Sequence, residues 1–279
     1  MTDVQPIPQE ATGLTLAAGV EAIAPAAPAR KLGRAATELL RRRPTVIRDR
    51  IESLISRDEH LERIATQSYW HENGFAKIRL LRGSSFGVRL HVWPAGPDRL
   101  GEVDPHGHRW AFASWIAAGV GVEETIYLDV TGRRRDSRVN ALVYTRYEYS
   151  RDTNGFLAHP QEARLRVAGR RRHVKGEVYS CAQTALHVVA PIGTGLVATI
   201  VLQGPATLGS TPVYSRRGRP AVTDEEPIDT DVLRKLLREV AAEIDRTEAP
   251  EPRYSPRRVY RQMADRLPGR TTVKSDEGG

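Results

Sequence analysis

The sequence predicts a mainly β protein, a sandwich or barrel of short strands, with helices before and after it in the chain. Apolar segments of five to nine residues recur between residues 76 and 202, and Gly, Pro, Asp and Asn clusters separate them. About nine strands with turn signals roughly every 8–15 positions favour a sandwich or barrel over a βαβ arrangement. Helical periodicity is confined to the segments on either side.

Composition excludes several classes of protein. Of the 279 residues, 40% are hydrophobic and 27% are charged, which fits neither a fibrous nor a wholly disordered chain. No apolar run approaches the roughly 20 residues that cross a bilayer, and the acidic, Pro-rich start of the chain does not resemble a signal peptide. The single cysteine, Cys181, excludes an internal disulfide. We therefore expect a soluble, cytoplasmic protein that does not contact a membrane.

The net charge of +8 is carried mostly by arginine, because only five of the 42 basic residues are lysines. Two clusters stand out, Arg133–Arg135 with Arg138 and Arg170–Arg172. Both lie beside Gly, Asp or Ser, and no aromatic residues alternate with them as in single-strand nucleic-acid sites. We interpret both clusters as solvated hairpin loops and expect no nucleic-acid partner.

The N-terminal region divides into two segments. Residues 1–30 are rich in Ala, Pro and Gly and are expected to lack fixed structure. Residues 31–75 form a helical lead-in, in which apolar residues such as Val46, Ile47, Ile51 and Leu54 recur at helical spacing.

Residues 76–206 form the expected β-domain. Its predicted strands are Ala76–Leu81, Gly87–Trp93, Trp110–Ile116, Glu124–Val130, Ala141–Tyr149, Ala163–Val167, Glu177–Cys181, Ala185–Val189 and Leu196–Leu202.

The C-terminal region is expected to be helical again. Residues 207–268 comprise a linker, a helix whose apolar face includes Leu233, Leu236 and Leu237, and a short basic helix near Arg258–Leu267. Residues 269–279 are expected to form a flexible tail. The helices on both sides cover the barrel or form a homodimer.

The segment Asp104-Pro105-His106-Gly107-His108 carries the strongest chemical signal. Two histidines at positions i and i+2 of an extended segment point to one side, so both imidazoles can reach one metal ion. His187 is the natural third ligand, because a histidine within the apolar strand Ala185–Val189 needs a polar partner. The alternative is that His106 and His108 are loop residues and His187 is a hydrogen-bonded core residue. His60, His71, His159 and His173 lie among polar residues and are interpreted as surface residues.

Two stretches, PHGHRWAFASWIAAG and GEVYSCAQTALHVV, resemble the two motifs of the cupin superfamily. The resemblance covers roughly residues 75–205 and implies a double-stranded β-helix, or jelly-roll, barrel. In that family the two motifs supply His ligands, here His106, His108 and His187, and often a Glu four or five residues after the second His. Phe112 and Ala113 occupy those positions, so we expect no carboxylate ligand, with Asp104 able to support a ligand histidine.

A three-His site without a carboxylate resembles the thiol dioxygenase branch of cupins, typified by cysteine dioxygenase. The resemblance implies Fe(II), O₂ and a small organic substrate, such as a thiol or an amino-acid derivative. It also implies that Arg79 grips the substrate's carboxylate and that Gln203 occupies the place of the family's active-site Tyr. The family's cross-link cysteine would fall near Ala113 and is absent.

Two other functions stay open. The chain could be a non-catalytic cupin that binds a metal or a small ligand. It could also be an isomerase or lyase that uses Zn, Mn or Ni as a Lewis acid.

Overall fold

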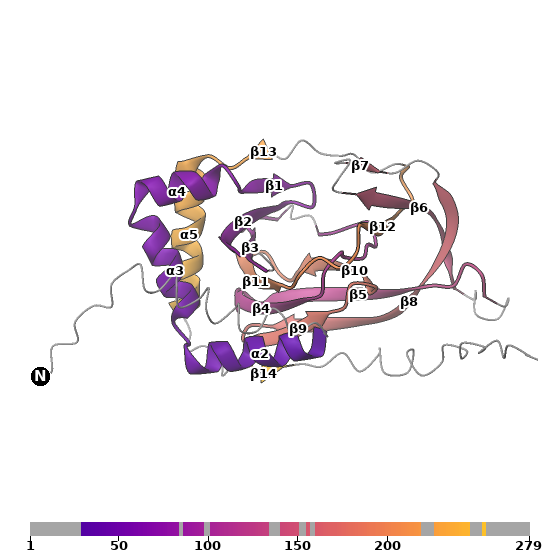
Figure 1. Cartoon of the computed structure of the whole chain (residues 1–279), viewed down its shortest axis with the longest axis horizontal. Helices are drawn as coiled ribbons and strands as arrows, with labels where there is room; N and C mark the ends of the chain where they lie inside the picture. The colour runs from indigo at the N-terminus through magenta and orange to yellow at the C-terminus, as the bar shows by residue number, and fades with distance from the viewer. Residues whose placement is uncertain are drawn as a thin grey trace, which may run out of the picture.

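The structure is a computed structural model in which two β-sheets face each other and helices pack against one of them (Figure 1). It describes residues 29–83, 86–97, 101–133, 140–150, 155–156, 160–218, 226–245 and 253–254. The expectations for residues 1–28, the arginine cluster at 134–138, His159, the helix at 258–267 and the tail lie outside these residues.

The larger sheet has eight strands within the described residues, in the order β13-β1-β2-β3-β11-β4-β9-β14. Neighbouring strands are antiparallel except β14, which runs parallel to β9. In chain order the strands are β1 (Tyr69–His71), β2 (Phe75–Arg82), β3 (Gly87–Trp93), β4 (Phe112–Ala118), β9 (Glu177–Cys181), β11 (Val197–Gln203), β13 (Glu226–Pro227) and β14 (Arg253–Tyr254).

The second sheet has the order β10-β5-β8-β6-β12, and the short β7 pairs with β6. All of its described pairings are antiparallel. Its strands are β5 (Gly121–Asp129), β6 (Leu142–Ser150), β7 (Gly155–Phe156), β8 (Gln161–Val174), β10 (Leu186–Pro191) and β12 (Ser210–Ser215). The predicted fold class is confirmed: the protein is mainly β, a two-sheet jelly roll with helices on both sides of it in the chain.

Four described helices cover the outer face of the larger sheet (Figure 1). They are α2 (Ala29–Arg42), α3 (Val46–Ile55), α4 (Asp58–Ala65) and α5 (Thr230–Asp245). The residues of β2 and β3 alternate between two faces, as the period of a strand requires. Ile78, Leu80 and Leu90 pack against the helices, whereas Phe75 and Trp93 face the other sheet.

The chain therefore has two separate cores on the two faces of one sheet. The outer core joins the sheet to the helices, and the inner core lies between the sheets around Phe112, Ile116 and Val201. Because the outer core packs the sheet against the helices, polar groups on the inner face do not disrupt the packing between sheet and helices. No helix within the described residues is both long and apolar enough to cross a membrane.

Two sequence expectations about strands are wrong. Arg170–Arg172 do not form a loop, because β8 extends to Val174 and pairs these residues with Glu123–Thr125 of β5. Three consecutive arginines do not show the apolar alternation of a strand, but acidic residues face them across the ladder, and Arg172 lies 3.7 Å from Glu123. The strand β12 was also not predicted, because its sequence STPVYS is short and contains a proline.

We predict that Leu237→Ala lowers the free energy of unfolding by about 2–5 kcal/mol, because Leu237 is fully buried in the outer core. Val232→Ala on the same helix is the control, since Val232 is 41% exposed and its truncation should cost at most about 0.5 kcal/mol. Urea denaturation followed by circular dichroism measures both. Equal losses in the two variants would contradict the outer core described here.

Candidate metal centre

The segment that carries His106 and His108 is hydrogen-bonded to the second sheet. His106 and His187 exchange two backbone hydrogen bonds, of 3.2 and 3.1 Å between nitrogen and oxygen. The Gly107 amide donates to the Pro212 carbonyl at 3.0 Å, and the His108 amide to the Gln183 carbonyl at 3.0 Å. A side chain at Gly107 would place its Cβ 3.1 Å from that Gln183 oxygen, so glycine permits this close approach.

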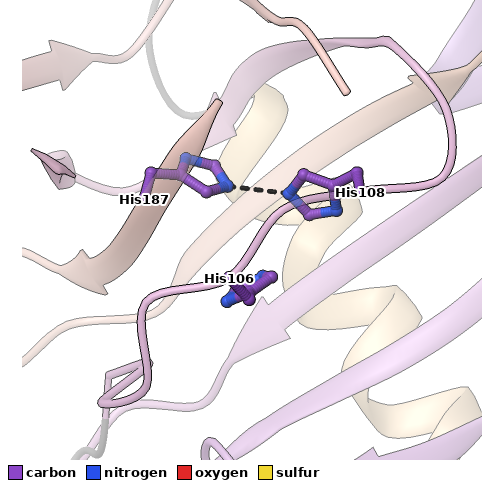
Figure 2. Close-up of side chains that lie close together, drawn as sticks. All are labelled: His106, His108 and His187. Atoms are coloured by element: carbon purple, nitrogen blue, oxygen red, sulfur yellow. Dashed lines mark hydrogen bonds between the residues drawn. The ribbon is translucent and has the colours of Figure 1, made fainter. Parts of the chain in front are cut away.

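These contacts bring the three predicted histidines together (Figure 2). One nitrogen from each of His106, His108 and His187 lies within 4.8 Å of the other two. The ring centroids are 4.9 to 5.5 Å apart. His108 Nε2 and His187 Nε2 approach to 2.8 Å. The structure thus places His106, His108 and His187 around one point, although His108 and His187 are 79 residues apart in the sequence.

The hydrogen bonds of the rings suit a metal ion. His187 Nδ1 donates to the buried carboxylate of Glu124 at 2.7 Å, and His106 Nδ1 donates to the Asp104 carbonyl at 3.0 Å. A neutral imidazole that donates from Nδ1 has its lone pair on Nε2. His106 and His187 therefore present Nε2 lone pairs as ligands, and a cation bound to them would also satisfy the close contact with His108.

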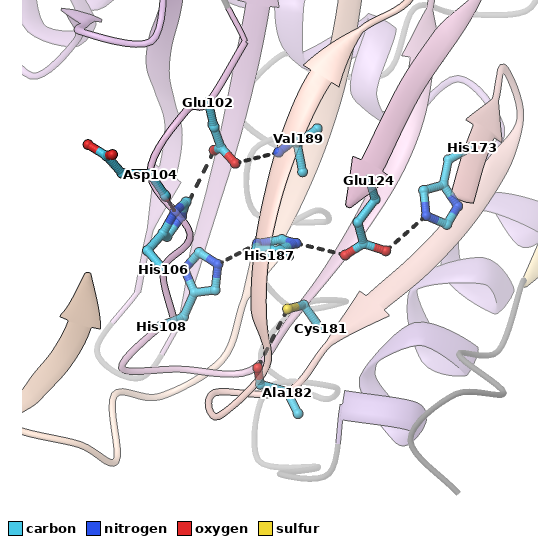
Figure 3. A network of polar contacts seen from close by, with 10 residues as sticks. All are labelled: Glu102, Asp104, His106, His108, Glu124, His173, Cys181, Ala182, His187 and Val189. Atoms are coloured by element: carbon cyan, nitrogen blue, oxygen red, sulfur yellow. Dashed lines mark hydrogen bonds and ion pairs between the residues drawn. The ribbon is translucent and has the colours of Figure 1, made fainter. Parts of the chain in front are cut away.

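Glu124 is the residue that sequence reasoning failed to identify as part of the site. It is fully buried, and its second carboxylate oxygen lies 3.2 Å from His173 Nε2 (Figure 3). His173 is 1% exposed and stacks on Tyr179 with centroids 4.1 Å apart, so the expectation of a surface histidine is wrong. The alternation of side chains along the strand could have predicted that Glu124 is buried, because it places Glu124 on the same face as Val122 and Ile126.

Two other acidic residues lie next to His106. Asp104 supports His106 through its backbone carbonyl, whereas its carboxylate lies 3.6 Å from the Arg217 guanidinium. Glu102 places one oxygen 4.0 Å from His106 Nε2, and its other oxygen accepts the Val189 amide at 2.7 Å. The Phe112 ring lies against His108 and His187, with centroids 4.9 and 5.9 Å away, where the cupin motif would have its Glu.

Cys181 borders the same buried group. Its sulfur lies within 4.8 Å of the ligand atoms of Glu124 and His187, and it is fully buried on β9. It donates to the Ala182 carbonyl at 3.5 Å. A thiol in this position adds a soft donor beside the three histidines without belonging to their group.

Arg79 and Gln203 line one cavity of about 340 Å³ at the ends of β2 and β11. Both lie on the sheet face that is opposite the helices. The three histidines do not line this cavity. Trp110 lies near both places: its ring centroid is 5.3 Å from the guanidinium carbon of Arg89, a residue that lines the cavity, and 6.3 Å from the His108 ring.

Two further histidines lie inside the barrel near β1 and β3. His71 stacks on Phe75 with centroids 4.7 Å apart, so it is not a surface residue as expected. Burial, and then the charge of Lys77, lowers the pKa of His71 to about 2 and the pKa of His91 well below its usual value. His91 Nε2 and Trp93 Nε1 are buried and have no hydrogen-bond partner in the structure. Polar groups of this kind indicate an interior that accepts water or a polar ligand.

Comparison with known proteins adds a set of distant structural neighbours. No protein-family model and no curated protein matches the sequence. An RmlC-like cupin family protein from Methanocaldococcus jannaschii is 10% identical, with 50% of this chain and 89% of that chain covered and a TM-score of 0.26. A cupin-superfamily sugar phosphate isomerase from Silicibacter pomeroyi is 13% identical, with 55% and 83% covered and a TM-score of 0.28.

A third neighbour is the hydroxypropylphosphonic acid epoxidase from S. wedmorenis, which is 13% identical at a TM-score of 0.24. The match covers 49% of this chain and 53% of the epoxidase. The neighbours thus include cupins and several enzymes. These TM-scores are too low to support a fold assignment, which therefore rests on the two sheets described above.

We predict that Glu124→Gln weakens metal binding about 10- to 100-fold, because an amide orients His187 less firmly and removes the buried negative charge. The control is Glu123→Gln on the same strand. The Glu123 carboxylate faces Arg172 at the surface, so this substitution should leave the metal affinity unchanged. Competition with a chelator of known affinity measures both. Equal affinities in wild type and Glu124→Gln would contradict the role assigned to Glu124.

We also predict that His106→Ala removes the metal and leaves the fold intact, because the sheets and the outer core do not depend on His106. Metal analysis and circular dichroism of the same sample check both statements. A variant that retains stoichiometric metal would show that His106 is not a ligand.

The lowered pKa of His91 predicts acid sensitivity. The unfolded chain takes up a proton below about pH 6.5 that folded His91 does not, so stability is full above that pH and falls below it. The loss is about 1.4 kcal/mol per pH unit for one such group. His91→Gln should flatten the dependence between pH 7.5 and 5.5 in urea titrations. An unchanged slope would contradict the buried, neutral state of His91.

Proposed function

We propose that the chain is a mononuclear non-haem iron enzyme of the cupin superfamily that acts with O₂ on a small organic anion, such as a thiol or an amino-acid derivative. The observation that carries the proposal is the convergence of one nitrogen from each of His106, His108 and His187 within 4.8 Å. When bound, Fe(II) supplies one-electron chemistry with O₂ that no side chain can provide.

The chain's own residues prepare this site in three ways. Glu124 orients His187 by accepting a hydrogen bond of 2.7 Å from its Nδ1. The negative charge of Glu124 would also offset part of the positive charge of a bound metal. The Phe112 ring excludes water from one side of His108 and His187. Three neutral imidazoles would leave about three coordination positions of a divalent ion open, enough for both a substrate and O₂.

Arg79 and Gln203 would bind the substrate. An anion offsets the positive charge that three neutral ligands leave on the metal. Arg79 offers a planar pair of donors for an acidic group, and Gln203 adds a hydrogen bond from the neighbouring wall of the same cavity. In this arrangement both residues orient the substrate, and the reacting atoms lie at the histidines.

Iron analysis combined with oxygen uptake tests the proposal. Protein purified without a His-tag should contain about one iron per chain and consume O₂ with at least one member of a panel of small thiols and amino acids. Full iron occupancy without O₂ uptake would favour the non-catalytic cupin. Stoichiometric Zn, Mn or Ni would favour the isomerase or lyase.

Arg79→Ala should raise the apparent dissociation constant of the active panel member about 30-fold or more, because it removes a charge-assisted contact. Gln203→Ala should have a smaller effect in the same direction. Metal content should stay unchanged in both, since neither residue touches the histidines. Arg41→Ala on α2 is the control, as Arg41 pairs with Glu38 at the surface. Wild-type substrate affinity in Arg79→Ala would exclude this pocket as the binding site.

A further inference from the structure

Three arginines, Arg79, Arg82 and Arg89, line the cavity that also contains Gln203. The register of β2 and β3 makes Arg79 and Arg89 direct cross-strand partners, on the sheet face opposite the helices. Like charges directly opposite each other in an antiparallel pair destabilise the sheet. Arg89 also lies over the Trp110 ring, 5.3 Å from its centroid, so the register places two positive charges side by side next to this ring.

Among the described residues that line the cavity there is no Asp or Glu. Elsewhere arginines pair with acids, as Arg146 does with Glu148 and Arg234 with Asp58. Arg79 differs from them, because its Nε is buried and has no hydrogen-bond partner in the structure. A buried, unpartnered guanidinium donor costs free energy unless a ligand accepts from it.

The remaining walls are apolar or glycine. Leu81, Phe86 and Pro205 supply carbon surface, and Gly87 leaves space for the amide of Gln203. A Cβ at Gly87 would lie 3.2 Å from Gln203 Oε1. The cavity therefore combines a cluster of donors with an apolar wall, at a volume of about 340 Å³ that suits a small metabolite.

We infer that this cavity binds a phosphate-bearing small molecule. A phosphate monoester carries close to two negative charges and three acceptor oxygens, which matches three guanidinium groups better than a single carboxylate does. Arginine is the residue best suited to hold such oxygens in pairs. The carbon part of the ligand would lie on Leu81, Phe86 and Pro205.

This inference goes beyond the proposed function, because binding of the phosphate requires no metal. Its role as the substrate's anchor does rest on the proposed function. The Trp110 ring is near both Arg89 and His108, so a ligand anchored at the arginines could extend along this ring toward the histidines.

Isothermal titration of the full-length protein with inorganic phosphate tests the site, before and after treatment with a chelator. Phosphate should bind equally in both samples, and more tightly than acetate or succinate at equal ionic strength. R79M and R89M should each weaken phosphate binding at least tenfold. R238M, at an exposed position of α5, is the control and should bind as wild type does.

The thermal midpoint in phosphate-free buffer separates binding from folding. R79M should keep or raise that midpoint, because it removes a like-charge pair. Phosphate binding no tighter than that of acetate, tighter binding of succinate, or an equal loss in R238M would overturn the inference. Phosphate binding in a chain that holds no iron would support this site and contradict only the iron proposal.

Discussion

The buried hydrogen bond between Glu124 and His187 is the interaction on which the site depends. Glu124 is fully buried, and a carboxylate in such a place is tolerated only when it is paired on every side. Its two oxygens contact His187 at 2.7 Å and His173 at 3.2 Å. The three residues lie on neighbouring strands β10, β5 and β8, so the pairing of the second sheet sets the direction of the His187 ring.

The separation of the two cores explains why the fold tolerates this polarity. Helices α2 to α5 bury the outer face of the larger sheet in an apolar layer, and a second apolar cluster lies between the sheets around Phe112 and Ile116. The interior then carries unpartnered donors such as Arg79 Nε and Trp93 Nε1. Polar groups of this kind reduce stability unless a ligand pairs with them, and here they lie on the sheet face opposite the helices.

The sequence was sufficient for the fold class and for the convergence of His106, His108 and His187, because period-two alternation and an HxH spacing are local patterns. It was insufficient for Glu124, His173 and the Arg79–Arg89 pair. Their roles depend on register between strands, and Glu124 pairs with a histidine 49 residues away. In GVEET, alternation places Glu124 on the same face as Val122, but neither this stretch nor RRRHV shows which residues of the neighbouring strands lie opposite.

The central claim is that three imidazoles bind one iron, and X-ray absorption of the iron-loaded protein tests it most directly. The account predicts one iron per chain with three imidazole nitrogens at about 2.0–2.2 Å and further oxygen ligands. It also predicts that the same spectrum in His187→Ala loses the imidazole signature. A wild-type spectrum with sulfur ligation from Cys181, or one unchanged by His187→Ala, would contradict the claim.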